Sequence, residues 1–166
     1  MKKLFISLML IAPTTLFAQK FGHANFQEIM TTMPEYIQAE ADIKKVTSQK
    51  EEELKTMQKE FQTKYEDYQK NESTMNASKK AEVERELEAI DQKVRQAYQD
   101  GQQEISKMQQ EKIQPIMDKL AQAIKNVGAA GGYVYIMDSG STINYINDSI
   151  SKDVSAEVKN ELKKMK

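Results

Sequence analysis

The stretch Ile43–Tyr68, IKKVTSQKEEELKTMQKEFQTKYEDY, decides the fold. Its apolar residues recur at intervals of three and four, with Lys50 at the one step where an apolar residue is missing. Such intervals place side chains along one stripe of a helix. The remaining residues are mostly Glu, Lys and Gln, as in long helices and coiled coils, and the regular spacing argues against disorder. The stripe consists of Ile43, Val46, Leu54, Met57, Phe61, Tyr65 and Tyr68.

A second stripe follows a polar break at residues 71–78, where the weak helix formers Asn, Ser and Thr are concentrated. Two stripes around one break predict an antiparallel helical hairpin, an arm over residues 43–114 with its tip near 71–78. A fold at about residues 74–75 would bring Leu54 opposite about residue 95, beside Val94 of the second stripe. That stripe consists of Leu87, Ile90, Val94, Tyr98, Ile105, Met108, Ile113, Ile116, Leu120, Ile124 and Val127, with Gly101 at one step.

Residues 19–42 are predicted to form the first part of a small body. Residues 20–24 have the composition of a short strand. Asn25 can cap a following helix, and Glu28 stands where a capping box needs an acidic residue. Pro34 predicts the start of a second helix, because a proline at the first helical position loses no intrahelical bond.

Residues 115–166 are predicted to complete the body. Pro115 should kink or restart the helix where the arm ends. Glycines at 128, 131 and 132 should then stop it. Strands are expected at residues 133–137 and 142–146, joined as a β-hairpin by a turn at 138–141.

A last helix is expected after Asp153 or Ser155, either of which can cap it, with Val154, Val158 and Leu162 on its apolar face. The predicted fold class is mainly α: a long antiparallel coiled-coil helical hairpin on a small α/β body.

Residues 1–18 have the features of a secretory signal peptide. Two lysines follow Met1, the run Leu4–Ala12 is apolar, and Ala18 is a small residue at a suitable cleavage point. The apolar run is shorter than the roughly 20 residues that a membrane-spanning helix needs, which disfavours an uncleaved anchor. We therefore expect cleavage after Ala18, a periplasmic mature chain and no transmembrane anchor.

Charge and composition exclude several functions. Without Lys2 and Lys3 the chain carries 22 basic and 25 acidic residues, a net charge near −3. This balance gives no argument for nucleic acid, which usually binds clustered Lys and Arg. The chain has no Cys, so stability must come from packing or oligomerisation rather than from disulfides.

No catalytic, cofactor or metal site is predicted. His23 is the only histidine, whereas metal sites normally combine several His, Cys or carboxylate ligands. The many carboxylates alternate with lysines, as on a solvated helix face. The glycines near residues 128–132 lack the Lys-Ser/Thr that completes a phosphate-binding loop.

The bulky apolar residues of the arm have two possible roles. Most of them should pack the two arm helices together, but a thin two-helix arm cannot fully bury them all. Those left exposed would form a flexible surface for unfolded clients, a role that suits methionine. The candidate client contacts are Met57, Phe61, Tyr65, Tyr68, Met75 and Tyr98.

The body is expected to drive oligomerisation. It is small, and short strands with exposed edges favour pairing between subunits. The candidate assembly residues are Phe21, Val134, Ile136, Ile143 and Tyr145.

The whole predicted mature chain resembles the Skp/OmpH family of periplasmic chaperones. The signal peptide, early strand, Met33-Pro34-Glu35-Tyr36 segment and long charged hairpin occur in the family's order. The most specific stretches are GYVYIMD at residues 132–138 and DVSAEV at residues 153–158.

This resemblance implies a homotrimer shaped like a jellyfish, in which body strands assemble between subunits and three arms enclose a cavity. It implies that unfolded outer-membrane proteins are held there without ATP before membrane insertion. One feature departs from the basic arms of well-known members: residues 44–112 carry 14 Lys or Arg and 15 Asp or Glu. A lipopolysaccharide site is therefore not carried over. The alternative function is a structural coiled-coil envelope protein or adaptor that binds one folded partner.

Overall fold

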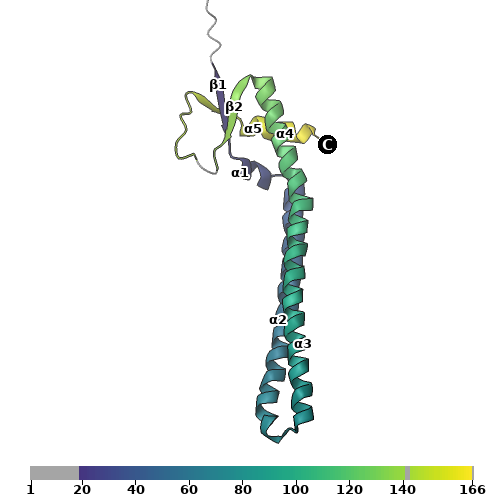
Figure 1. Ribbon diagram of the computed structural model, residues 1–166. Helices are drawn as coiled ribbons and strands as arrows, with labels where there is room; N and C mark the ends of the chain where they lie inside the picture. Colours follow the sequence, from purple (N-terminus) through teal and green to yellow (C-terminus); the bar gives the residue numbers. More distant parts are fainter. Residues whose placement is uncertain (1–18, 141–142, 166) are drawn as a thin grey trace, which may run out of the picture.

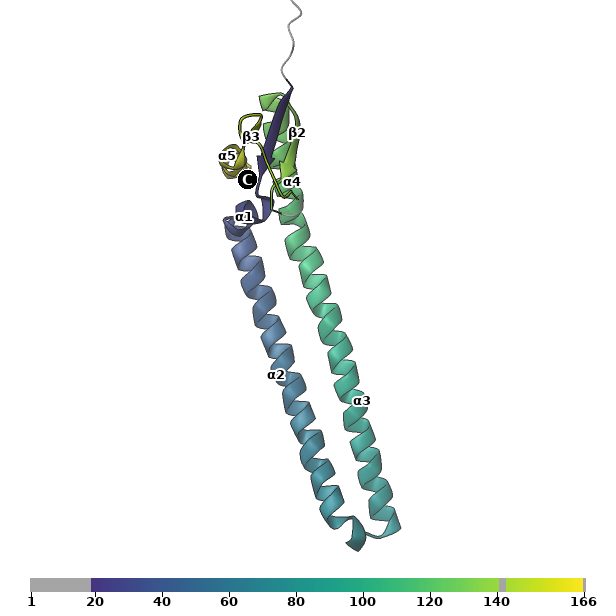
Figure 2. The ribbon, with the colours of Figure 1, turned by 90° about the vertical axis from the view of Figure 1, so that its left-hand side faces the viewer.

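The computed structural model describes residues 19–140 and 143–165, so the predicted signal peptide at 1–18 lies outside the described residues. A small body carries one long two-helix arm (Figures 1 and 2). The elements are β1 (Lys20–Ala24), α1 (Phe26–Thr31), α2 (Pro34–Asn71), the 3-10 turn Glu72–Thr74, α3 (Ala77–Met108), the π turn Gln109–Ile113, α4 (Gln114–Gly131), β2 (Tyr133–Asp138), β3 (Ser151–Asp153) and α5 (Ser155–Lys164). The predicted fold class is confirmed for the single chain.

The first two helices begin where the sequence predicts. The Asn25 side chain accepts a hydrogen bond from the Glu28 backbone N–H at 3.0 Å and caps α1. Pro34 is the first residue of α2. These local signals fix the point at which the chain leaves the body and enters the arm.

The arm consists of α2 and α3, which are 38 and 32 residues long, or about 57 and 48 Å at 1.5 Å per residue. The chain reverses at residues 72–76, inside the predicted tip, and the Asn76 side chain caps α3 by accepting from the Lys79 N–H at 2.9 Å. The returning helix passes through the π turn at 109–113 and continues as α4, with Pro115 as its second residue. A π turn directly before a proline is the predicted restart, since the helix must accommodate the missing N–H.

The sheet differs from the predicted hairpin. Its strand order is β2-β1-β3, and β1 pairs parallel with both neighbours. The predicted hairpin is therefore wrong: residues 143–146 form no strand, and the third strand comes later, at Ser151–Asp153. Because β2 and β3 run in the same direction, the chain between them must travel back along the sheet. The described residues 143–150 of this connection lie beside the sheet (Figure 1).

One face of the sheet packs against helices and forms the core. Gly22 and Ala24 lie on this face, where a Cβ added at Gly22 would meet the Ile136 side chain at 3.1 Å. Gly132 ends α4 with a φ of 66°, which allows the sharp entry into β2. The core cluster consists of Ala24, Ile29, Met33, Ala39, Ile116, Leu120, Ala123, Val154, Val158 and Leu162. It includes all three residues predicted for the apolar face of α5.

Candidate functional site

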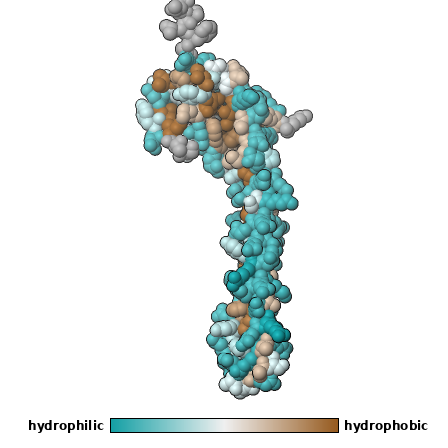
Figure 3. Space-filling model, in the orientation of Figure 1, coloured by the Kyte–Doolittle hydropathy of each residue, from teal (hydrophilic) through white to brown (hydrophobic). Residues whose placement is uncertain are grey.

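The distal part of the arm holds an apolar strip. Val83, Leu87 and Ile90 of α3 are buried, whereas no residue of α2 beyond Ala39 is buried. The space-filling view agrees: the arm surface is mostly hydrophilic, with apolar colour near its distal end (Figure 3). The two arm helices therefore share a narrow seam, and many of their larger side chains stay in contact with water.

Polar contacts join the two helices across the arm. The Tyr68 hydroxyl donates to Glu84 Oε1 at 2.7 Å, and this bond raises the pKa of Tyr68 to about 12. The Lys64 ammonium lies 2.5 Å from Glu86 Oε2, and its hydrogen bond lowers the pKa of that carboxyl group. Both contacts join residues that the predicted hairpin brings within a few positions of each other.

The middle of the arm is polar at its centre. The Lys50 side chain crosses over Gly101, whose added Cβ would lie 3.6 Å from the Lys50 Cβ and Cγ atoms. The Lys50 ammonium pairs with Glu104 Oε2 at 3.1 Å, which raises the pKa of Lys50. In the middle of the arm, the aliphatic part of the Lys50 side chain therefore lies against Gly101, in place of the apolar contacts found nearer the tip.

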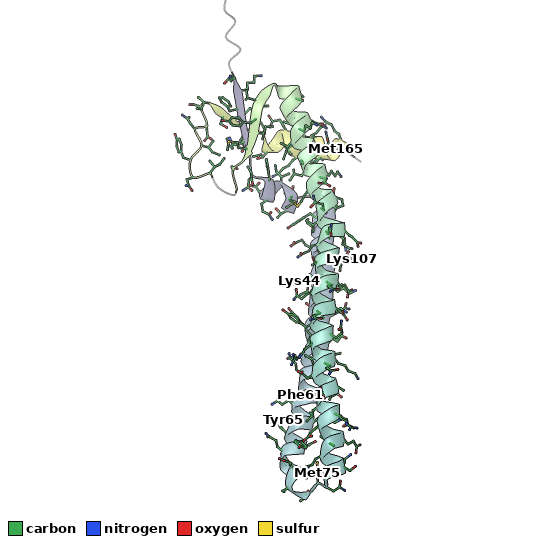
Figure 4. All side chains as sticks on the ribbon, viewed as in Figure 1. Lys44, Phe61, Tyr65, Met75, Lys107 and Met165 are labelled. Atoms are coloured by element: carbon green, nitrogen blue, oxygen red, sulfur yellow. The ribbon has the colours of Figure 1, made fainter. Side chains whose placement is uncertain are left out.

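The six candidate client contacts differ in exposure. Tyr65 and Tyr98 are 44% and 57% exposed, and the remaining four, Met57, Phe61, Tyr68 and Met75, are half-buried. The Phe61 and Tyr65 rings stack with centroids 6.1 Å apart, and both lie with Met75 toward the distal end of the arm (Figure 4). Tyr68 belongs to the cross-arm contacts through its bond to Glu84. The most accessible rings are therefore Tyr65 and Tyr98.

The outward face of the sheet, opposite α4, is a second apolar surface. Phe21 and Tyr135 are register partners with ring centroids 4.8 Å apart, and Met137 pairs with His23 on the same face. The loop before β3 covers part of this face and leaves an apolar cavity of about 370 Å³ between loop and sheet. The outward face is lined by Phe21, His23, Tyr135, Met137, Ile143, Tyr145, Ile146 and Ile150.

The structure places the five candidate assembly residues on both faces of the sheet. Phe21, Ile143 and Tyr145 line the outward face, and Tyr145 is 79% exposed. Val134 is exposed on the edge strand β2. Ile136, however, packs against the core on the α4 side. The outward face also holds Tyr135 and Met137, which were not among the candidates, although period-two alternation separates them from Ile136.

The described residues show no metal cluster and no membrane span. Over residues 19–140 and 143–165, no three or more His, Asp or Glu side chains are grouped so that they could hold a metal ion. Within the same ranges, no helix combines the length and apolar character needed to cross a bilayer.

The molecule is thus a long helical-hairpin arm on a small sheet-containing body, whose outward apolar face is only partly covered. The chain belongs to the OmpH-like outer membrane protein family, whose model matches residues 20–162. The family predicted from the sequence is therefore confirmed.

Two relatives and one crystal structure are similar over most of the chain. Chaperone protein Skp of Yersinia enterocolitica is 26% identical over 158 residues, covering 95% of this chain and 94% of the relative. Chaperone protein Skp of Pectobacterium atrosepticum is 24% identical, covering 88% and 87%. A crystal structure of an OmpH-like protein from Caulobacter crescentus matches with a TM-score of 0.67 at 14% identity, covering 87% of this chain and 83% of that one. At that identity the structural match demonstrates the shared fold alone.

Proposed function

We propose that this chain is an ATP-independent periplasmic holding chaperone, which binds unfolded outer-membrane proteins and prevents their aggregation before membrane insertion. The observation that carries the proposal is the arm, which keeps aromatic rings in contact with water while charged side chains surround them. Membership of the OmpH-like family, with two relatives named as chaperones, supports the same function.

The arm suits weak binding of many unfolded chains. Tyr65 and Tyr98 present apolar rings with a polar hydroxyl, and the half-buried Met57 and Met75 can repack around different partners. Acidic and basic residues are nearly equal along residues 44–112, so client capture relies on apolar contacts more than on net charge. Binding of this kind needs no catalytic group and no nucleotide.

The outward face supports assembly of several copies through their bodies. Tyr135, Met137, Tyr145 and Ile150 are each at least 45% exposed in the single chain, and an apolar patch of this kind marks an interaction surface. Edge strands β2 and β3 also leave one side unpaired within the described sheet. A second copy of the same body is the occupant that fits both features, and the family resemblance supports three copies arranged around a central cavity.

Localisation completes the proposal. The segment at residues 1–18 acts as a signal peptide that is removed after Ala18, and the mature chain works in the periplasm. Mass spectrometry of the protein recovered from a periplasmic extract tests this, with Gln19 expected as the first residue.

The central experiment measures holding activity directly. Purified mature protein, at several-fold molar excess over client and without nucleotide, should suppress light scattering from a urea-unfolded β-barrel protein after dilution. Unchanged aggregation would contradict the proposal. Capture of one folded envelope protein, together with no holding activity, would favour the structural adaptor instead.

The client surface has its own test. Replacing both exposed rings, Tyr65→Ser with Tyr98→Ser, should weaken client binding about three- to tenfold, equivalent to roughly 1 kcal/mol. Titration of a labelled unfolded client, followed by fluorescence anisotropy, measures the change. The matched control is Gln58→Ser with Gln102→Ser, which places the same residue at exposed positions on the same two helices.

A second variant separates client contact from arm packing. Tyr68→Phe removes the hydroxyl that bonds Glu84 but keeps the ring. It should leave client affinity near that of the natural chain. If Tyr68→Phe weakens binding as much as the loss of both exposed rings, the arm geometry rather than the exposed rings determines binding.

A further inference from the structure

We propose that His23 is a protonation-dependent latch, which fixes the turn Asn147–Ile150 to the sheet and thereby tightens assembly through the outward face at mildly acidic pH. The assembly part of this inference rests on the proposed oligomer. The latch itself is a property of the single chain.

His23 is unusual in its position. It is the only histidine, and it lies 9% exposed on the central strand of a sheet whose outward face is otherwise apolar. Its backbone carbonyl accepts from the Val154 N–H at 2.9 Å, so the strand is fixed at this point. The backbone that carries the imidazole is therefore held at a defined place.

Both ring nitrogens face groups from the segment around β3. Nδ1 lies 3.0 Å from the Ser151 hydroxyl oxygen, and Nε2 lies 3.9 Å from Asp148 Oδ1. A neutral imidazole has one N–H donor and one lone pair, whereas an imidazolium has two donors. Ser151 can satisfy Nδ1 in either state, because a hydroxyl group both donates and accepts. Protonation of His23 therefore allows it to donate to Ser151 and, at the same time, to attract the Asp148 carboxylate.

Several ionisable side chains share a cavity with the imidazole. Asp153, its register partner on β3, and Glu28 of α1 line the same polar cavity of about 500 Å³ as Asp148. Lys159 is the cation from α5, and it is paired with Glu28 at 3.1 Å. The ionisable groups that share the outward cavity with His23 are the phenols of Tyr135 and Tyr145. The polar cavity next to the ring therefore holds three carboxylates, one of which is paired with Lys159.

The turn that carries Asp148 is a defined unit. The backbone carbonyl of Asn147 accepts from Ile150 at 3.1 Å and from Ser151 at 2.9 Å, while the Asn147 side chain accepts from the Ser149 N–H at 3.0 Å. Drawing Asp148 toward His23 therefore holds the whole turn. Ile150 belongs to the turn, and Tyr145 and Ile146 lead into it, so the latch sets the position of apolar groups that line the outward face.

The test is sedimentation equilibrium of the mature chain between pH 8.0 and 5.5, across the range in which histidine changes charge. As the pH is lowered, the apparent dissociation constant of the oligomer should fall about two- to fivefold for each subunit interface. The expected change is this small because the Asp148 carboxylate is 88% exposed, which weakens its pairing with His23. Asp148→Asn and His23→Gln should each abolish the pH dependence. The matched control Asp100→Asn removes an exposed carboxylate from the arm and should retain it.

Two results would overturn the latch: a pH-independent constant for the natural chain, or a pH dependence that persists in both Asp148→Asn and His23→Gln. Circular dichroism checks folding, and Asp148→Asn remains informative if His23→Gln does not fold.

A chain that stays monomeric at every pH would contradict the proposed assembly but would leave the latch testable. Amide hydrogen exchange at residues 147–151, corrected for the intrinsic effect of pH, should then show greater protection at pH 5.5 in the natural chain and not in Asp148→Asn. Equal protection in both chains would overturn the latch independently of assembly.

Discussion

The body and the arm are stabilised in different ways. In the body, Ile29, Val154 and Val158 are completely buried and belong to one continuous core. In the distal part of the arm, the buried apolar residues Val83, Leu87 and Ile90 keep 8–9% of their surface exposed, and lysines and glutamates flank the seam. The body resembles a conventional globular core, whereas the arm is a two-helix strip with water on every side.

This difference means that the arm can change shape at little cost. A fully packed core resists any change in volume, but a narrow seam loses few contacts when its helices separate or slide. Stability is therefore concentrated in the body, and adaptability is concentrated in the part proposed to hold clients.

The largest effect should come from truncating the body core. Ile29→Ala removes a fully buried side chain and should lower the free energy of unfolding by about 2–5 kcal/mol. Urea denaturation at one fixed protein concentration measures this, since self-association also contributes to stability. A loss below about 1 kcal/mol would contradict the described core.

A smaller effect is expected in the arm. Leu87→Ala should cost about 2 kcal/mol at most, near the lower limit for such truncations, because the open seam can close around the missing atoms. Hydrogen exchange should locate the change in residues 83–90 and their α2 partners, with the body unchanged. A cost equal to that of Ile29→Ala would show that the two regions are stabilised alike.

The middle of the arm should respond in the opposite direction. Gly101→Ala adds a methyl group at ordinary contact distance from the Lys50 side chain and removes the entropic cost of a helix-interior glycine. The arm should gain about 0.5–1 kcal/mol, seen as slower amide exchange around residue 101. Destabilisation would mean that the close approach of the helices at this level depends on glycine.

The smallest effect concerns the ion pairs that cross the arm. Hydrogen bonds from lysine lower the carboxyl pKa of Glu86 and Asp42 below their ordinary values of 4.5 and 3.8. Such carboxylates stabilise the folded arm at pH values above their pKa in the unfolded chain. This contribution is lost as the pH falls through their lower pKa in the folded chain. Helix content should therefore decline slightly between pH 5 and pH 3. Glu86→Gln should reduce this decline, and an identical decline in both proteins would assign it to other groups.

The sequence predicts the local features of this fold better than its pairings. Asn25, Pro34 and the residues of the arm stripes act on their immediate neighbours, so their spacing was sufficient to place two helix starts and the hairpin tip. The direction of β2 and β3 depends on β1, which is more than 100 residues away in the chain. Nothing in the sequence of residues 133–153 itself distinguishes a hairpin from two parallel partners of a distant strand.

The same limitation explains the candidate surface residues. Alternation along β2 separates Val134 and Ile136 from Tyr135 and Met137, but it does not say which set faces the helices. Gly22 resolves the question in the structure, because its missing side chain makes room for Ile136 on the α4 side. The exposure of Tyr65 and Tyr98 likewise depends on the rotation of each arm helix, which stripe spacing defines only coarsely.

The central position of β1 has a consequence for the order in which the molecule forms. This strand stands at the beginning of the described chain, and both of its partners lie beyond residue 132. The arm hairpin requires only its own residues and can form as a local unit, whereas the sheet must wait until β2 and β3 are present. A chain that stops before residue 133 would therefore display a finished arm beside an unpaired first strand, and the residues from 133 onward close the body around it.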